Sequence, residues 1–180
     1  MSALLRGSML LGLSIAAASC ARTARPDGGS GLLPVGAPAS DVTGTTTDGK
    51  SIRLSAVRGH PAVVYFYPKD ETPGCTREAC AFRDAFTKYV THNVTIFGVS
   101  RDSEESHREF RKKHSLPFPL VADEDGKAAE AYGVSSTLGM ASRVTFLVGS
   151  DGRVVRVWPN VDPGVHADEV LAAVDEAEKR

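Results

Sequence analysis

The segment Ala62–Cys80, AVVYFYPKDETPGCTREAC, determines the class of fold. Residues 62–67 form a continuous run of apolar and aromatic side chains, which is typical of a strand buried on both faces of a sheet. Thr72 followed by Pro73 indicates the start of a helix, with Thr as the N-cap and Pro at the first helical position. A buried strand that leads through a short loop into a helix predicts an α/β protein.

The rest of the chain continues this alternation of strands and helices. After a hairpin turn at Asp48-Gly49, the expected strands are 51–54, 62–67, 94–99, 120–122, 144–148 and 154–158. The expected helices are 73–90, 103–114, 126–132 and 167–179. This order predicts a mixed central sheet flanked by helices.

Composition excludes several classes of protein. The chain has 180 residues, and 21 Lys and Arg against 22 Asp and Glu give a net charge of -1. Such a balance argues against a nucleic-acid-binding protein, which is usually basic. Three cysteines are too few for a disulfide scaffold. No uncharged apolar run reaches the length of about 18 residues that a membrane-spanning helix needs.

The first 19 residues have the pattern of an export signal. Arg6 is the only charged residue before a short apolar run at 9–15, and small residues follow. Cys20 comes directly after Ala-Ala-Ser and resembles the cysteine of a bacterial lipobox, although Ala17 stands where Leu is usual. The alternative is ordinary signal cleavage without a lipid. We therefore expect an exported protein of the bacterial periplasm or cell envelope, anchored by a lipid on Cys20.

Residues 20–35 differ in composition from the segments before and after them, residues 1–19 and 36–180. They are rich in Gly, Pro and small polar residues, which is typical of a flexible tether. We expect this tether to connect the lipidated end to a single domain at residues 36–180.

Cys75 is the candidate nucleophile. It follows the buried strand and lies in the first turn of the predicted helix, where unpaired backbone N–H groups and the helix dipole favour a thiolate. The alternatives are that Cys75 and Cys80 are small core residues or a zinc pair. Zinc is disfavoured because the five histidines form no pair with the short spacing of a structural site; they are His60, His92, His107, His114 and His166.

The spacing of Cys75 and Cys80 separates two redox classes. Thioredoxin-type exchangers use C-x-x-C, whereas four residues lie between these two cysteines. On an intact helix their Cα atoms would be roughly 8–9 Å apart, and a disulfide requires less than about 7 Å. The helix must therefore partly unwind before they can pair. This arrangement fits an oxidant-scavenging thiol that forms a sulfenic acid and then meets a resolving thiol.

The segment 65–84 resembles the active site of peroxiredoxins, and most closely that of the bacterioferritin-comigratory-protein or Q-type subfamily. Pro68, Thr72 and Cys75 match the family pattern of Pro, three residues, Thr, two residues and Cys. Cys80 matches the resolving cysteine that Q-type members have five positions later. The similarity extends from about residue 33 to 177, with further matches at 98–102, 116–120 and 143–147.

The resemblance implies a thioredoxin-like fold and thiol peroxidase activity. Cys75 would be the peroxidatic cysteine, Cys80 would resolve it as an intramolecular disulfide, and a donor such as thioredoxin would reduce that disulfide. Thr72 and Arg143 would hydrogen-bond the thiolate and the peroxide, and Pro68 would shield the pocket. The choice of Arg143 rests on the resemblance alone. The resemblance also implies a monomer. The sequence contains no metal, haem or flavin motif, so we expect no cofactor and expect the electrons to pass through the sulfurs.

Two other functions are compatible with a tethered thioredoxin-like protein. A copper carrier of this fold uses two cysteines with three residues between them and a distal His, so the four-residue gap counts against it. A membrane-tethered thiol–disulfide exchanger would have C-x-x-C. Copper titration and an insulin-reduction assay distinguish these alternatives from a peroxidase.

Overall fold

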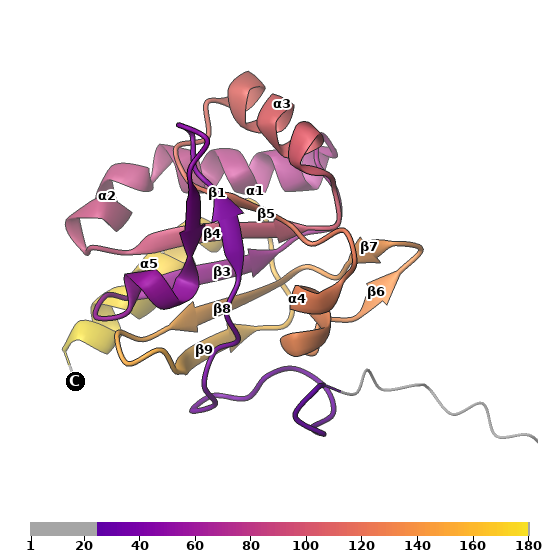
Figure 1. Cartoon of the computed structure of the whole chain (residues 1–180). Helices are drawn as coiled ribbons and strands as arrows, with labels where there is room; N and C mark the ends of the chain where they lie inside the picture. The colour runs from indigo at the N-terminus through magenta and orange to yellow at the C-terminus, as the bar shows by residue number, and fades with distance from the viewer. Residues whose placement is uncertain (1–24, 180) are drawn as a thin grey trace, which may run out of the picture.

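The computed structural model describes residues 25–179, which form a seven-stranded mixed sheet with helices on both faces (Figure 1). The strand order is β2-β1-β5-β4-β3-β8-β9. The strands are β1 Thr43–Thr45, β2 Ser51–Arg53, β3 Ala62–Phe66, β4 Thr95–Ser100, β5 Leu120–Ala122, β8 Val144–Val148 and β9 Val154–Trp158. The predicted α/β class, with a mixed sheet flanked by helices, is confirmed.

Helices connect the parallel strands at the centre of this sheet. β3, β4 and β5 are mutually parallel, whereas β8 joins β3, and β1 joins β5, in antiparallel orientation. The helices are α1 Pro73–Asp84, α2 Phe86–Thr91, α3 Glu104–His114, α4 Lys127–Ala131 and α5 His166–Glu178, with a 3-10 helix η1 at Leu54–Val57. The loops that follow β3 and β4 therefore lie at the same edge of the sheet.

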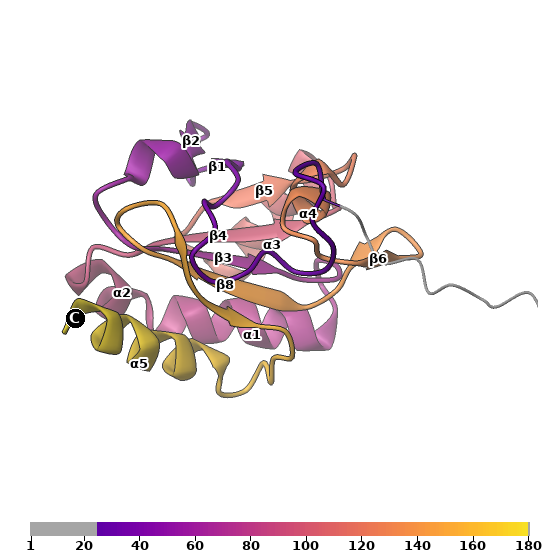
Figure 2. The same ribbon diagram turned by 90° about the horizontal axis from the view of Figure 1, so that it is seen from below.

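The central strand β3 separates two hydrophobic cores. Val63 and Tyr65 point into the core that α1, α2, α3 and α5 cover, whereas Val64 and Phe66 point into the core beneath α4 and η1. Figure 2 shows α1 and α5 side by side along one face of the sheet. All five residues of β3 are buried, which explains why this segment is an unbroken apolar run.

Gly98 on β4 makes room for an aromatic side chain of β3. It is the register partner of Tyr65, and a Cβ atom at Gly98 would lie 2.6 Å from the Tyr65 hydroxyl oxygen. The absence of a side chain at this position therefore lets the Tyr65 ring lie under α1, stacked on Phe82 with ring centroids 4.9 Å apart.

The helix predicted at 73–90 is two helices. The prediction of one helix was wrong because the chain turns at Ala85, which has φ -87° and ψ -1° and connects α1 to α2. The turn changes which residues face the core. Tyr89 is fully buried, whereas the neighbouring apolar residue Val90 is 52% exposed.

The packed region begins earlier than the predicted boundary at residue 36. The Leu33 side chain is buried in the core beneath α4, and its N–H donates to the Tyr132 carbonyl at 2.9 Å. Leu32 and Leu33, two apolar residues of the predicted tether, pack on the domain. The Gly- and Pro-rich composition around them gave no indication of this packing. The predicted signal and Cys20 lie outside the described residues. Within residues 25–179, no helix is long and apolar enough to cross a membrane.

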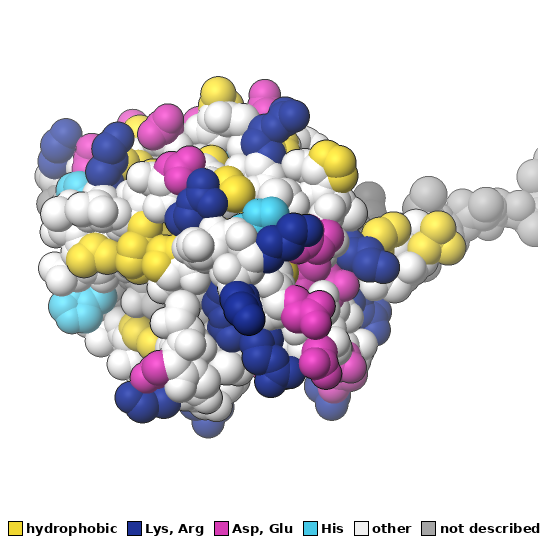
Figure 3. Space-filling view, turned by 90° about the horizontal axis from the view of Figure 1, so that it is seen from above, with side chains coloured by type: hydrophobic (Ala, Val, Ile, Leu, Met, Phe, Trp, Pro, Cys, Tyr) yellow, Lys and Arg dark blue, Asp and Glu magenta, His cyan; other side chains and the backbone are white. Residues whose placement is uncertain are grey.

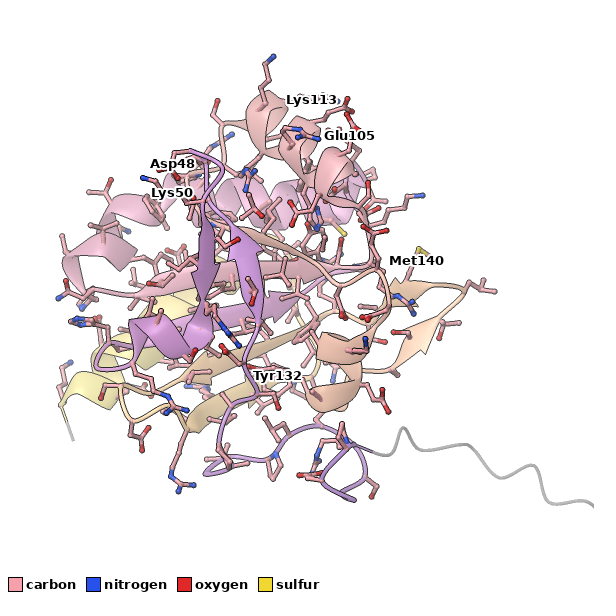
Figure 4. All side chains as sticks on the ribbon, viewed as in Figure 1. Asp48, Lys50, Glu105, Lys113, Tyr132 and Met140 are labelled. Carbon is pink, nitrogen blue, oxygen red and sulfur yellow. The ribbon has the colours of Figure 1, made fainter. Side chains whose placement is uncertain are left out.

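A small hairpin stands beside the edge where β3 and β4 end, and the sequence did not predict it. Its strands are β6 Ser136–Thr137 and β7 Met140–Ala141. Leu138 at its turn has φ 53° and is 91% exposed, and Met140 is partly exposed (Figure 4). The hairpin leads directly into the segment that carries Arg143.

Charges of both signs are interspersed on the surface, in agreement with the net charge of -1. Figure 3 shows cationic and anionic side chains next to one another on the face seen from above. Examples from α3 are the ion pair of Arg108 with Glu105 and that of Lys113 with Glu71.

Candidate active site

Cys75 lies in the first turn of α1, as the sequence predicted. Thr72 is the N-cap with an extended backbone, and Pro73 is the first helical residue. The Cys75 side chain is 1% exposed and packs in the core under α1. Backbone N–H groups at the start of a helix have no acceptor within the helix, so this end of α1 favours an anion. The local structure therefore suits a thiolate at Cys75.

Arg143 contacts the Cys75 sulfur. Its Nη2 atom donates to Cys75 Sγ at 3.2 Å, and its Nη1 atom is paired with a carboxylate oxygen of Glu78. Arg143 lies immediately before β8, which pairs with β3 and so brings it beside α1. A Cβ atom at Gly74 would lie 3.3 Å from Arg143 Nη2, so the glycine lets the guanidinium approach the helix closely.

Glu78 is a buried carboxyl group one turn after Cys75. Its side chain has no exposed surface, and only one of its two oxygens is paired, with Arg143. Burial is the main cause that raises the pKa of Glu78 to about 7, although the positive charge of Arg143 opposes this shift. Glu78 therefore titrates near neutral pH while it holds the guanidinium that touches the sulfur.

The other unpaired buried atom among the described residues is the hydroxyl oxygen of Tyr65. Its pKa is raised well above its usual value, mainly by burial and further by the nearby charges of Glu78 and Asp70. Tyr65 thus remains a neutral hydroxyl within the same core that surrounds Cys75. Unpaired buried polar groups are rare in folded proteins.

Pro68 and Thr72 lie at the two ends of the loop between β3 and α1, and both are half-buried. The Thr72 hydroxyl donates to the Lys69 carbonyl at 2.9 Å and makes no side-chain bond to the helix N-terminus. In this state, Thr72 therefore fixes the loop, and its hydroxyl proton points to Lys69. The residue types of this loop were predictable from the family pattern, whereas the direction of the hydroxyl was not.

A buried polar network holds the middle of the same loop. Asp70 is 5% exposed, and its carboxylate accepts from the Tyr67 hydroxyl at 2.8 Å and the Ser106 hydroxyl at 2.7 Å. His107 Nδ1 lies 2.9 Å from the same carboxylate, and its Nε2 lies 3.1 Å from the Val121 carbonyl. Burial opposes ionisation of Asp70, but these bonds outweigh it and lower the pKa of that carboxyl.

The next residue of the loop is held from the surface of α3. Glu71 has φ 61°, a conformation that is strained for a residue other than glycine. Its carboxylate lies 2.6 Å from Lys113 Nζ and 3.3 Å from His114 Nε2; Lys113 is labelled in Figure 4. The contacts from α3 to Asp70 and Glu71 thus fix the loop that precedes Cys75.

Cys80 lies on the same uninterrupted helix as Cys75. Both residues are free cysteines; Cys75 is buried and Cys80 is half-buried. The spacing argument from the sequence therefore applies to this state, since both lie within Pro73–Asp84 and five positions of helix separate them. Within residues 25–179, no group of three or more His, Cys, Asp or Glu side chains is arranged to hold a metal ion.

The comparisons with known proteins agree with this geometry. Residues 35–157 match the model of the AhpC/TSA family. The chain belongs to this family, the peroxiredoxins. It is 37% identical over 156 residues to peroxiredoxin Bcp of Bacillus subtilis. The aligned region covers 82% of this chain and 99% of that protein. The chain is therefore an oxidoreductase with thiol peroxidase activity.

Solved structures of other peroxiredoxins share the fold. The peroxidoxin BcpB of Mycobacterium tuberculosis superposes with a TM-score of 0.73 at 31% identity, over 80% of this chain and 97% of that one. The bacterioferritin comigratory protein of Xanthomonas campestris superposes with a TM-score of 0.69 at 38% identity. The superposition covers 76% of this chain and 91% of that one. These similarities confirm the predicted thioredoxin-like fold of this peroxiredoxin.

The sequence did not reveal three groups of this peroxiredoxin site: Glu78, the Asp70–His107 pair and Glu71. A signal for Glu78 was present, because it lies three residues after Cys75 and so on the same face of the helix. The pairing of Asp70 with His107 joins residues 37 positions apart, and no local pattern marks it.

Proposed function

We propose that this peroxiredoxin reduces hydrogen peroxide and organic hydroperoxides by way of a Cys75 sulfenic acid and an intramolecular Cys75–Cys80 disulfide. The observation that carries this proposal is the 3.2 Å contact between Arg143 Nη2 and the Cys75 sulfur, in the first turn of α1. The similar bacterioferritin comigratory protein of Xanthomonas campestris has an alkyl peroxide reduction activity, which supports organic hydroperoxides as one class of substrate.

In the first step the Cys75 thiolate attacks one oxygen of the peroxide. The S–O bond forms as the O–O bond breaks, and the leaving oxygen takes a proton and departs as water or an alcohol. Arg143 is always charged and offers fixed donors, so it can stabilise both the thiolate and the negative charge that develops on the leaving oxygen. Glu78 orients Arg143 for this role through their buried pair.

Pro68 and Thr72 complete the site in this proposal. Pro68 is half-buried at the start of the loop and shields the sulfur from bulk water. The Thr72 hydroxyl turns from the Lys69 carbonyl to the thiolate or the bound peroxide when the substrate enters. The rotation exchanges the bond to Lys69 for a bond at the reacting centre.

Cys80 then resolves the sulfenic acid. The two cysteines share an intact helix, so the first turns of α1 must open for the sulfurs to meet. Gly74 lies in this first turn, and the low helix propensity of glycine favours its opening. A thiol donor, thioredoxin or a thioredoxin-like protein, reduces the disulfide and completes an antioxidant cycle.

A steady-state peroxidase assay tests this function. The chain is supplied with hydrogen peroxide, cumene hydroperoxide or tert-butyl hydroperoxide, and with thioredoxin, glutathione or dithiothreitol as donor. We expect the wild type to turn over. We expect Cys80→Ser to complete the first oxidation step but not to be recycled by thioredoxin. Cys80→Ser should also expose Cys75 to over-oxidation. Equal recycling in both proteins would contradict the intramolecular disulfide.

We further propose that the protein is an exported monomer, held at the cell envelope by a lipid on Cys20. The signal pattern of residues 1–19 and the lipobox-like residues before Cys20 support this location. Cys20→Ala should move the protein from the membrane fraction to the soluble fraction, because the lipid is the attachment that this proposal assigns. Unchanged fractionation would favour cleavage without a lipid or another mode of attachment.

A further inference from the structure

The tip of the β6–β7 hairpin carries an exposed apolar side chain on a strained backbone. Leu138 is 91% exposed, more than any other large apolar side chain in the described part of the chain, and Met140 is 39% exposed. Leu138 and Gly139 both have positive φ, 53° and 77°, and such a two-residue turn strongly favours Asn or Gly at its first position. Leucine there suits neither the turn nor the core, which indicates a contact outside the domain.

The hairpin is fixed at its base and uncharged along its length. Val134 and Ala141, which flank it, are buried in the core beneath α4 and η1. Residues 134–142, VSSTLGMAS, contain no charged side chain, in a chain of which 24% is charged. Figure 3 shows hydrophobic side chains on the part of the molecule that projects at the right. The tip can therefore enter an apolar phase without any charge losing its hydration.

The chain enters the domain beside the base of this hairpin. The Gly31 carbonyl oxygen lies where a Cβ atom at Gly133 would be only 1.8 Å away. The Leu33 N–H donates to the Tyr132 carbonyl at 2.9 Å. Arg25 Nη1 donates to the Gly31 carbonyl at 3.0 Å, which holds the first described residues at the same place. Figures 1 and 2 both show the start of the described chain and the hairpin on the same side of the molecule.

A lipid on Cys20 would turn this side of the domain toward a membrane. Five positions separate Cys20 from Arg25, and five residues of chain span at most about 18 Å. Five positions also separate Leu138 from Arg143, whose guanidinium contacts the Cys75 sulfur. The lipid attachment, the hairpin tip and the reacting thiol are thus all within reach of one bilayer surface.

We propose that the β6–β7 hairpin docks on the lipid bilayer through Leu138 and Met140, so that the enzyme reduces hydroperoxides of membrane lipids. This inference rests on the proposed peroxidase function and on the proposed lipid at Cys20. A hydroperoxide group on an acyl chain is polar, and it therefore favours the membrane interface over the hydrocarbon. The docked hairpin holds the active site at that interface.

The chemistry is that of the proposed peroxide step. The Cys75 thiolate attacks the terminal oxygen of the lipid hydroperoxide, and the S–O bond forms as the O–O bond breaks. The leaving oxygen takes up the proton that the thiol released and stays on the lipid as an alcohol. Cys75 is oxidised to the sulfenic acid and the lipid is reduced.

The test compares the same protein on two substrates. The lipoprotein is purified from the membrane fraction in detergent and reconstituted into phosphatidylcholine vesicles that contain some phosphatidylcholine hydroperoxide, with dithiothreitol as donor. Consumption of the lipid hydroperoxide and of added hydrogen peroxide is measured in separate samples. The variant is Leu138→Asn with Met140→Gln, because Asn suits the turn and both changes remove apolar surface. The matched control is Val90→Gln, on α2 at the opposite side of the molecule in Figure 1, where Val90 is 52% exposed.

The double variant should consume the lipid hydroperoxide about tenfold more slowly than the wild type, because burial of even one such side chain favours the docked state by about that factor or more. Its rate with hydrogen peroxide should be unchanged, which also shows that the variant is folded. Val90→Gln should match the wild type on both substrates.

A second measurement detects the docking itself. In vesicles, Leu138→Trp should show blue-shifted emission that phosphatidylcholine with brominated acyl chains quenches, whereas Val90→Trp should show neither effect. The native Trp158 is buried and common to both proteins. Emission from Leu138→Trp that is unaffected by the brominated lipid would overturn the docking.

The outcomes separate this inference from the function on which it rests. A wild type that reduces neither substrate would overturn the proposed function and this inference with it. A wild type that reduces both, with the double variant slowed on neither substrate or equally on both, would overturn the membrane contact alone. A mature protein without a lipid on Cys20, as found by mass spectrometry, would also overturn it.

Two other partners of the hairpin give different results. If the double variant keeps its rate on the lipid hydroperoxide but is reduced more slowly by thioredoxin, the hairpin contacts the protein donor. If it keeps that rate but changes its oligomeric state, the hairpin contacts a second copy of the chain. Either result would overturn the lipid contact and leave the peroxidase function intact.

Discussion

Arg143 Nη2 lies 3.2 Å from the sulfur of Cys75, although the two residues are 68 positions apart in the chain. The antiparallel pairing of β8 with β3 creates this contact, because it carries the start of β8 to the edge at which β3 leads into α1. One guanidinium thus contacts both the Cys75 sulfur and the buried Glu78 carboxyl. The electrostatic surroundings of the Cys75 sulfur therefore depend on the sheet as well as on its own helix.

Loss of this guanidinium should slow the peroxide step. We predict that Arg143→Ala lowers the rate of Cys75 oxidation on the order of 10²-fold or more, because a preorganised cationic donor is removed. Stopped-flow mixing with hydrogen peroxide measures that rate, with Arg108→Ala as the control. A rate in Arg143→Ala within a few-fold of the wild type would mean that another group stabilises the reaction.

Glu78 should make stability fall as the pH rises. Its pKa is raised from its ordinary value of 4.5 to about 7 in the folded protein, so the unfolded chain releases this proton first. Its contribution to stability is complete below pH 4.5 and is lost progressively up to about pH 7. The pKa difference corresponds to a loss on the order of 3 kcal/mol.

Glu78→Gln removes this titration. The unfolding free energy of Glu78→Gln minus that of the wild type should therefore increase between pH 5 and pH 8, as measured by urea denaturation. Other titrating groups largely cancel in this difference. A difference that stays constant over that range would show that Glu78 does not hold its proton in the folded state.

The buried Asp70–His107 pair should be important for stability. We predict that Asp70→Asn costs about 3–5 kcal/mol of unfolding free energy at pH 7.5, because it leaves His107 without its buried partner. The pKa of Asp70 is lowered in the fold, so this contribution is lost as the pH falls, and the two proteins should converge toward acid pH.

The control for Asp70 is Asp48→Asn. Asp48 and Lys50 form an exposed ion pair at 2.7 Å on the β1–β2 turn (Figure 4). Such pairs contribute no more than about 1 kcal/mol. An Asp70→Asn variant that is no less stable than Asp48→Asn would show that the network does not hold the loop before Cys75.

The sequence was sufficient for the features that depend on local pattern. Residues 144–148 and 154–158 were placed correctly to the residue, because buried strands and a Gly-containing turn leave clear signals. Thr72 and Pro73 marked the helix start, and Cys75 followed from it. These features share one property, since each is determined by neighbours within a few positions of the chain.

Features set by tertiary packing were missed. The break at Ala85 arises where the chain turns so that Tyr89 can enter the core, and no Gly or Pro marks it. The burial of Leu33 depends on the Tyr132 carbonyl nearly 100 positions away. The bond between His107 and Asp70 also joins residues that are distant in the chain. So does the contact with Cys75 that distinguishes Arg143 from the other arginines.

The opening of α1 has a direct signature in hydrogen exchange. A disulfide between Cys75 and Cys80 is incompatible with an intact first turn, so amides of residues 73–84 should exchange clearly faster in the oxidised than in the reduced protein. Amides of β3 should not change, and they serve as the internal control. Equal protection of 73–84 in both forms would exclude local unfolding of this helix as the route to the disulfide.

Peptide mapping after a single turnover tests the central claim most directly. The reduced protein is treated with one equivalent of hydrogen peroxide, unreacted thiols are alkylated, and the digest is analysed by mass spectrometry. The account predicts a peptide cross-linked between Cys75 and Cys80 in the wild type, and in Cys75→Ser no consumption of peroxide and an alkylated Cys80. Peroxide consumed by Cys75→Ser at the wild-type rate, or a wild type whose Cys75 is alkylated after the peroxide is gone, would contradict it.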